Sequence, residues 1–409
     1  MTDPAGGPLT GVRVVDISTS YAGPTASMYL ADMGADVVKV ERPGGDDARA
    51  WGPPFVDGES AWFHSANRGK RSIAVNLRSP AGVELLHRLL EGADVFVENL
   101  NPAKLAGLGL DPGTVRRRHP QLVYCAISGF GFTGPDAATP GYDLIAQARS
   151  GLMSVTGARG GTPQRVSTAL SDIVTGLVAA FAVTAALHGR TRTGEGDFVD
   201  VSLLDTDLAL MAPRIASYLA GEPEPAPSGG TDSVLAVYQA FETADRPIVV
   251  AVGNDGLWRR FCAAVGLPDL AADPALATNE GRREQRPRIL PAIAGRLAER
   301  PAAEWLARLG EASIPASVIQ PLSEVVADRQ VVARSGVGPL DNGVRVVAPP
   351  WRFGSDPPPA GTGCAAIRAA GADGRALLSE YGLTEAEITA LVDAEALVLP
   401  DPIRAQVAP

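Results

Sequence analysis

The sequence predicts an α/β fold, with an open, mainly parallel Rossmann-like sheet in a large domain and a smaller α+β domain after it. Short β-branched runs alternate with helical stretches over the first 200 or so residues, which is typical of a parallel sheet covered by helices. A segment rich in proline and glycine follows at residues 221–230, and a new pattern of strands and helices begins after it. The length of 409 residues is enough for two or three domains.

The first predicted unit is a strand, a helix and a second strand. Residues 11–17 form a β-branched run that predicts a buried strand, residues 25–33 predict a helix that ends at Gly34, and residues 36–40 predict the next strand. The loop after the first strand has a single glycine, Gly23, and therefore lacks the three-glycine dinucleotide fingerprint. A nicotinamide cofactor is not expected.

The alternation continues to about residue 220. Further strands are predicted at residues 73–75, 94–98, 121–127 and 198–201, and helices at residues 80–91 and 203–219. Arg42, Asn99 and Ser128 each follow the end of a predicted strand. Ligands of open parallel sheets bind beyond the carboxyl ends of the strands, so these three residues are site candidates by geometry alone.

The remainder of the chain predicts the domain organisation. We expect a large domain at residues 1–220, completed by residues 330–409, and a small domain at residues 235–320. The segments 221–234 and 321–359 are rich in proline and poor in periodicity, and we interpret them as linkers. Predicted elements of the later regions are a strand at 248–252 and helices at 258–265, 288–300, 303–309, 374–381 and 384–392.

The composition excludes several classes of protein. The formal net charge of −10 argues against non-specific binding of nucleic acid. The three cysteines, Cys125, Cys262 and Cys364, are isolated and lack metal-ligand spacing, which favours a reducing compartment without disulfides. No basic stretch followed by an apolar run begins the chain, so no signal peptide is expected and we predict a cytoplasmic protein.

The most apolar stretch runs from Ile173 to Leu187. Its 15 residues are fewer than the ~20 of a membrane span, so it predicts a helix buried on nearly all sides of a large core, with no membrane association. Asp172 stands directly before it. From these residues alone, Asp172 is either an N-cap of the helix or a nucleophile at the mouth of a pocket.

Other chemistry rests on scattered side chains. The four histidines show no metal-ligand spacing, so no metal site is predicted. A compact basic loop at residues 67–72 and single cations after strands suit a phosphate-bearing ligand. These cations are Arg42, Arg68, Lys70, Arg71 and Lys104. Unaided, the residues indicate an α/β enzyme that acts on an anionic ligand.

Several collinear motifs together resemble the family III CoA-transferases, the CaiB/BaiF family. They include VVDISTSYAGP at 14–24, NRGKRSIAVNL at 67–77, SGFGFTGP at 128–135, LSDIVTG at 170–176 and RTGEGDFVDVSLLD at 192–205. The resemblance covers nearly the whole chain, and the combination of motifs is specific.

The resemblance implies a transferase that moves CoA from an acyl-CoA donor to a carboxylic acid acceptor. It places an aspartyl–acyl anhydride and then an enzyme–CoA thioester on Asp172. It implies an acyl-CoA and a carboxylic acid as substrates, with no permanently bound cofactor. It also implies an interlocked homodimer, in which each chain threads through the other by its two linkers.

The resemblance further implies the loops that contact CoA. The matching residues are Ser20, Tyr21, Arg42, Val75, Asn76, Arg78, Asn99, Leu100, Asn101, Lys104, Tyr142 and Asp143. An arginine of some members matches Gly107 here, and Lys104, one helical turn earlier, is a candidate replacement. Gly229 and Gly230 match a glycine-rich substrate loop that is longer in some members.

Two alternative functions stay open. The α-methylacyl-CoA racemases of the same family have His where this chain has Tyr142, and they use that His and an Asp to exchange the α-proton. A tyrosine with a pKa of ~10 is a poor base near neutrality, which favours transfer over racemisation. The second alternative is a non-catalytic protein that binds CoA esters. The presence of Asp172 in an otherwise complete site argues against it.

Overall fold

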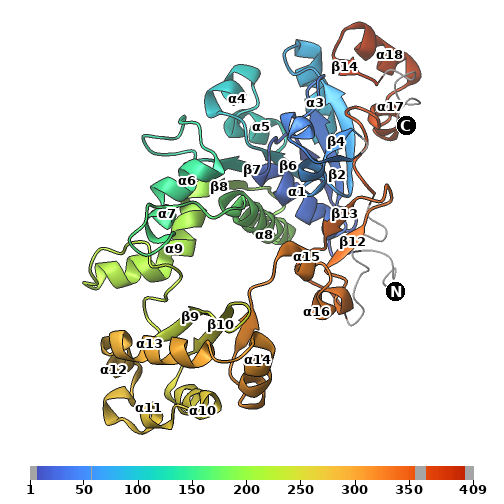
Figure 1. Ribbon diagram of the computed structural model, residues 1–409. Coiled ribbons are helices and arrows are strands. Elements are labelled where there is room, and N and C mark those ends of the chain that lie inside the picture. Colours follow the sequence, from blue (N-terminus) through green and yellow to red (C-terminus); the bar gives the residue numbers. More distant parts are fainter. Residues whose placement is uncertain (1–6, 57, 355–364, 401–409) are drawn as a thin grey trace. The chain divides into compact units, whose positions relative to one another are not determined.

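The computed structural model describes residues 7–56, 58–354 and 365–400, and the chain divides into two compact units (Figure 1). Unit 1 comprises Met1–Leu152, Val166–Ala220 and Arg329–Pro409, and unit 2 comprises Met153–Arg165 and Gly221–Asp328. The domain limits and linkers expected from the sequence stay predictions. Residues 355–359 of the second expected linker lie outside the described residues, as does Cys364.

Unit 1 is built on a seven-stranded sheet with the order β14-β5-β2-β1-β6-β7-β8. Neighbouring strands are parallel except for β14, which runs antiparallel to β5 at one edge. The order reverses at β1, which creates the switch point at which such sheets bind ligands. The prediction of a mainly parallel α/β sheet is therefore confirmed. The strands are β1 (Arg13–Asp16), β2 (Asp36–Glu41), β5 (Lys70–Val75), β6 (Val95–Glu98), β7 (Val123–Ser128), β8 (Phe198–Ser202) and β14 (Leu397–Val398).

Alternate residues of the strands face two different hydrophobic cores. Val14 and Val37 pack into a core with α1 (Ala22–Asp32) and α8 (Leu170–Thr193). Their neighbours Val15 and Val38 pack into the core on the opposite face of the sheet. Strands that are buried on both faces are apolar throughout, which explains why they appear in the sequence as short continuous runs. The helices of the second core are α3 (Pro80–Glu91), α4 (Pro102–Leu108), α5 (Pro112–Arg118), α17 (Gly374–Glu380) and α18 (Glu385–Asp393).

Further elements extend unit 1 around this sheet. Two of them, α6 and α9, pack on α8 and carry residues of the candidate site. These elements are β3 (Phe55–Val56), β4 (Glu59–Ser60), α2 (Ala61–His64), α6 (Asp143–Arg149), α9 (Leu203–Leu219), α16 (Arg329–Ala333), β12 (Val337–Pro339) and β13 (Arg345–Val347), with the short α7 (Leu152–Val155) at the boundary between the units.

The long helix α8 packs closely on α1. A side chain at Gly176 would place its Cβ 2.7 Å from the Cβ of Thr25, so only glycine permits this approach. The helix has 24 residues because it continues through the polar residues 188–193, and Gly194 ends it at a φ of +74°. Among the described residues it is the one helix that by length and composition is able to cross a membrane, and it packs here on α1, α9, β7 and β8.

One face of α8 is left uncovered by the described residues of unit 1. Phe181 is 73% exposed, and Leu177 and Val178 are each more than one-third exposed. The prediction of a helix buried on nearly all sides is therefore wrong for the single chain. The apolar residues surround the helix, whereas the sheet and the helices α1, α6 and α9 contact only part of its circumference.

Unit 2 combines a three-stranded antiparallel sheet, β11-β10-β9, with helices. Val237, Ile248 and Val250 of this sheet pack against helical residues that include Trp258 and Trp305. The alternate residues Tyr238 and Val249 are exposed. The elements are β9 (Val237–Phe241), β10 (Ile248–Val252), α10 (Asp255–Val265), α11 (Pro268–Ala272), α12 (Asn279–Glu284), α13 (Arg286–Leu297), α14 (Ala302–Glu311), β11 (Ala316–Val318) and α15 (Leu322–Val325).

Candidate active site

Two adjoining cavities open at the carboxyl end of the central sheet in unit 1. The larger, of about 570 Å³, is lined mainly by residues that follow β1, β2 and β5. The smaller, of about 260 Å³, is lined by residues that follow β1, β6 and β7 and by Asp172 of α8. Thr19 and Leu100 line both cavities. The two therefore form one continuous candidate site at the switch point of the sheet.

Most of the predicted site residues line this site. The larger cavity is lined by Arg42, Val75, Asn76, Arg78, Leu100 and Lys104. The smaller is lined by Ser20, Tyr21, Asn99, Leu100, Asn101, Tyr142 and Asp172. Gly107 lines neither cavity, whereas Lys104, its candidate replacement, does. The roles of all these residues in binding stay predictions.

Three predicted site residues lie elsewhere. Asp143 is buried behind the cavity wall, where its carboxylate accepts hydrogen bonds from Ser171 and Gln147. Gly229 and Gly230 belong to unit 2, where they line a cavity of about 620 Å³ together with residues of the three-stranded sheet.

Asp172 is the third residue of α8. The N-cap of this helix is Ala169, without a side-chain cap bond, so the interpretation of Asp172 as the N-cap is wrong. Burial raises the pKa of the Asp172 carboxyl to about 7, and the carboxylates of Asp143 and Asp207 add to the rise. The N-terminal end of the α8 dipole opposes this effect in part. A carboxyl group that faces a cavity and is half ionised near neutrality is typical of a functional site.

Two residues beside Asp172 were missed by the sequence reasoning. Ser171 donates its backbone N–H to Asp143 Oδ1 and its hydroxyl to Asp207 Oδ2, each at 2.8 Å. Asp207 is fully buried in α9. The only signal for Asp207 in the sequence was that it is a carboxylate within the apolar stretch of α9. The sequence does not show which face of that helix is buried.

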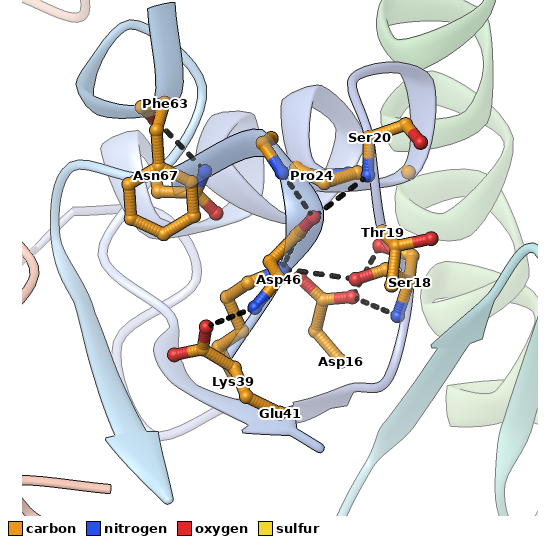
Figure 2. A network of polar contacts seen from close by, with 12 residues as sticks. Asp16, Ser18, Thr19, Ser20, Pro24, Lys39, Glu41, Asp46, Phe63 and Asn67 are labelled. Atoms are coloured by element: carbon orange, nitrogen blue, oxygen red, sulfur yellow. Dashed lines mark hydrogen bonds and ion pairs between the residues drawn. The ribbon is translucent and has the colours of Figure 1, made fainter. Parts of the chain in front are cut away.

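Buried charged side chains make hydrogen bonds to the backbone of the loop after β1 (Figure 2). Asp16 accepts from the backbone N–H of Ser18 at 2.8 Å. Lys39 Nζ pairs with Asp46 Oδ2 at 2.9 Å and donates to the carbonyl of Ser18 at 2.9 Å. Asp46 Oδ1 also accepts from the backbone of Ser20, which has a φ of +69°. A left-handed serine is strained backbone, which the surrounding contacts must hold in place.

The comparison with known proteins decides the family. Residues 9–363 match the family described as CoA-transferase family III. This chain belongs to CoA-transferase family III. The resemblance to the CaiB/BaiF proteins is confirmed, because a crystal structure of a CAIB/BAIF family protein from Brucella suis is 37% identical. It matches with a TM-score of 0.80 and covers 92% of this chain and 100% of that one.

Curated relatives indicate the activity of this chain. It is 43% identical to the succinyl-CoA:glutarate CoA-transferase of Mus musculus, over 80% of this chain and 75% of the mouse protein. It is 37% identical to the succinyl-CoA:mesaconate CoA-transferase of Haloarcula marismortui, over 82% of this chain and 86% of that protein. This protein is therefore a CoA-transferase.

The cations of the basic loop at residues 67–72 of this CoA-transferase serve its fold. Arg68 is almost fully buried and makes a bidentate contact with Asp32, at 2.9 and 2.6 Å. Lys70 is buried against Asp16, and Arg71 pairs with Asp36 and Glu380. None of the three lines either cavity of the candidate site. The expectation that this loop holds a phosphate-bearing ligand is wrong, because carboxylates of unit 1 already neutralise its charges.

The larger cavity of the transferase has other cations. Arg42 lines it but pairs with Asp47 of the same loop and donates to the carbonyl of Gly45 at 2.7 Å. Arg78 and Lys104 also line it, and both are exposed. No ion pair joins either of them to another described residue. They are therefore the cations that are available to an anionic ligand in this cavity.

Proposed function

We propose that this transferase moves CoA from an acyl-CoA to a carboxylic acid through covalent intermediates on Asp172. The supporting observation is that Asp172 lines the smaller cavity, and that its carboxylate has no hydrogen-bond partner among the described residues. Next to it, the larger cavity presents the available cations Arg78 and Lys104. A carboxylate without hydrogen bonds keeps its lone pairs for attack.

The proposed reaction begins at the donor thioester. The Asp172 carboxylate attacks the thioester carbonyl, the C–S bond breaks, and CoA leaves as a thiolate while an acyl–aspartyl anhydride remains. The thiolate then attacks the Asp172 carbonyl carbon, which releases the donor acid and leaves a CoA thioester on Asp172. Dividing the transfer into such steps avoids a need for ATP.

The acceptor acid reverses this sequence. Its carboxylate attacks the Asp172 thioester and again expels CoA thiolate, which gives a second anhydride. The thiolate attacks the acceptor carbonyl of that anhydride, so the acceptor leaves as its CoA ester and Asp172 is regenerated as a carboxylate. Anhydrides hydrolyse, and the site must therefore exclude water during these steps.

We assign the two ends of the acyl-CoA to the two cavities. The phosphates lie in the larger cavity, near Arg78 and Lys104, and the thioester reaches Asp172 in the smaller one. The shared lining residues Thr19 and Leu100 support a single ligand that passes through both. CoA enters and leaves as a substrate, with no permanently bound cofactor.

The relatives support a class of acceptor. Glutarate and mesaconate, the acceptors named for the mouse and Haloarcula enzymes, are small dicarboxylic acids. We assign the acceptor of this transferase to the same class, with succinyl-CoA as the first donor to test. Gly229 and Gly230, both in left-handed conformations, remain candidates for a substrate loop.

An interlocked homodimer is part of this proposal. The uncovered apolar face of α8 is accompanied by exposed apolar residues of α9, of which Leu219 is 78% exposed. Large exposed apolar surfaces are typical of protein interfaces, and a second copy of the chain is the occupant that we propose. The cytoplasmic location stays a prediction.

The racemase alternative lacks structural support. Tyr142 lines the smaller cavity in the place of the racemase histidine, and Asp143, its expected partner, lies behind the wall with its oxygens bonded to Ser171 and Gln147. A non-catalytic role leaves the half-ionised carboxyl of Asp172 without a purpose. Transfer is therefore the function that we propose.

The decisive experiment uses Asp172→Asn, which removes the nucleophile and retains the shape. This variant should keep its fold and melting temperature but lose CoA transfer by several orders of magnitude. Wild-type enzyme treated with acyl-CoA and then hydroxylamine should gain a hydroxamate on the peptide that contains Asp172, and omission of acyl-CoA should leave the peptide unmodified. Near-wild-type transfer by Asp172→Asn, or a hydroxamate on Asp143 instead, would refute the proposal.

A further inference from the structure

Two buried carboxylates from different helices hold Ser171, the residue directly before Asp172. Asp143 of α6 accepts from its backbone N–H, and Asp207 of α9 accepts from its hydroxyl, both at 2.8 Å. Asp143 is 8% exposed and Asp207 is not exposed at all. Three carboxyl groups therefore gather at the first turn of α8.

Among the described residues, no cation balances the charge of these carboxyl groups. In the part of the chain that the structure describes, no Lys, Arg or His side chain forms an ion pair with Asp143, Asp172 or Asp207. Both oxygens of Asp143 accept hydrogen bonds, whereas Asp207 Oδ1 is buried without a hydrogen-bond partner. An unpaired buried carboxylate destabilises a fold, so its position beside a nucleophile needs another explanation.

The titratable groups around Asp172 come from several elements. Asp143 lies on α6, Asp207 on α9 and Tyr21 on the loop before α1, and burial raises the pKa of both Asp207 and Tyr21. Strand β7 contributes the apolar Ile127 and the uncharged Ser128 to the cavity that Asp172 lines. Anions or neutral groups thus surround Asp172, and ionisation of Asp172 is opposed from two helices.

We propose that Asp207 is a positioning residue that, together with its hydrogen bond to Ser171, favours acylation of Asp172 by charge repulsion. This inference rests on the function proposed above. When the Asp172 carboxylate attacks a thioester and the C–S bond breaks, the negative charge leaves with the CoA thiolate. Asp172 is then a neutral acyl group in the anhydride and in the enzyme thioester.

The repulsion acts only on the free carboxylate. It raises the free energy of ionised Asp172 and leaves that of both neutral intermediates nearly unchanged, so it favours their formation. The hydrogen bond from Ser171 to Asp207 keeps this charge at a fixed place beside the first turn of α8. The buried, unpaired state of Asp207 follows from this role, because a cation partner would cancel the repulsion.

The test compares Asp207→Asn with wild type. The asparagine keeps an oxygen for the Ser171 hydroxyl and removes the charge. Burial, Asp143 and Asp207 raise the pKa of the Asp172 carboxyl, so we expect the acidic limb of the pH profile of kcat/KM to move to lower pH in Asp207→Asn. The fraction of enzyme that carries CoA on Asp172, read by intact mass spectrometry after incubation with acyl-CoA, should fall several-fold. The KM for acyl-CoA should change by less than roughly twofold.

Matched variants separate charge from structure. Asp207→Glu restores the charge and should restore the wild-type midpoint, and Asp205→Asn, which removes an exposed carboxylate on the same turn of α9, should leave it unchanged.

If Asp207→Asn does not fold, Asp207→Ser keeps a polar partner for Ser171 and carries the same expectations. A folded, uncharged variant with the wild-type midpoint and adduct fraction would overturn the inference. If wild type itself forms no adduct on Asp172, the proposed function fails instead, so the two failures are distinguishable.

Discussion

The side-chain amide of Asn99 is bonded to both polar groups of the Thr19 backbone. Its Oδ1 accepts from the N–H of Thr19 at 2.9 Å, and its Nδ2 donates to the carbonyl of Thr19 at 2.8 Å. These bonds join the loop after β6 to the loop after β1 at the point where the two cavities meet. Asn99 therefore fixes the shape of the junction between the two cavities, through which the acyl-CoA passes in the proposed function.

Asn99→Asp should weaken this junction. The carboxylate still accepts from the N–H of Thr19, but its second oxygen faces the carbonyl of Thr19 and repels it. We expect kcat/KM for every acyl-CoA to fall by a free energy of ~1–3 kcal/mol, the cost of a lost and uncompensated hydrogen bond. The same substitution at Asn254, the N-cap of α10, should have no effect, because Asp caps as well as Asn. Equal kinetics for both variants would contradict this role of Asn99.

Arg78 and Lys104 should contribute more to CoA binding than Arg42. Arg78→Ala and Lys104→Ala should each raise the KM for all acyl-CoA donors by a similar factor, equivalent to roughly 1.5–3 kcal/mol if a charged hydrogen bond is lost. The effect should shrink at high salt. Arg42→Ala should cost less, because Asp47 already neutralises this side chain. Arg116 is an exposed residue of α5, and Arg116→Ala is the control. A larger rise in KM for Arg42→Ala than for Arg78→Ala and Lys104→Ala would show that Arg42 is the main cation for CoA.

Glu98 should make the stability of the protein depend on pH. This residue ends β6, is fully buried, and accepts from the backbone N–H of Leu100 at 2.7 Å. Burial raises the pKa of Glu98 from 4.5 to about 8. Between these values the folded state holds a proton that the unfolded state has lost, so the free energy of unfolding falls as pH rises through this window and levels off above it.

Glu98→Gln should remove this pH dependence, because the amide does not titrate. The measurement is urea-induced unfolding at a series of pH values, with the difference between wild type and variant plotted against pH. Other carboxyl groups, Asp172 among them, contribute equally to both proteins and cancel in that difference. Parallel curves between pH 5 and pH 8 would show that Glu98 does not carry the raised pKa.

The proposed homodimer makes a prediction about mass. Size-exclusion chromatography with light scattering should give about twice the chain mass of 42.3 kDa, even in dilute solution. Phe181→Asp places a charge in the uncovered face of α8 and should reduce the yield of folded dimer, whereas Arg116→Asp on the exposed side of α5 should not. A stable, active wild-type monomer would exclude the dimer.

Local signals predicted much of the fold. The helices at residues 80–91 and 203–219 begin and end as predicted, because the serine N-caps Ser79 and Ser202 precede apolar periodic stretches. The length of α8 was underestimated, since helix formation continues through polar residues that the apolar run does not include. Its uncovered face could not be predicted, because an all-round apolar sequence contains no information about which side has a partner.

Long-range pairing limited the prediction of the site. Arg68 and Arg71 belong to a basic loop of the kind that binds phosphate. Their partners are Asp32 of α1 and Asp36 of β2, which lie about 36 residues earlier in the sequence. Asp172 was identified from its motif, whereas Asp207 required knowledge of how α9 packs on α8. Cavity-lining residues that follow strands were found, whereas the contacts of Ser171 and Asp207, which depend on how α6, α8 and α9 pack, were missed.

The position of the antiparallel edge strand β14 late in the sequence has a consequence for the biosynthesis of the enzyme. Its pairing with β5 and the bond from the N–H of Asn76 to the carbonyl of Ala396, at 2.9 Å, support the loop that forms one wall of the larger cavity. Chains are synthesised from the N-terminus, so this wall gains its support only after Ala396 and β14 have been made. A chain that stops before β14 already contains Asp172, the proposed nucleophile, but it lacks this support for the cavity that we propose binds CoA.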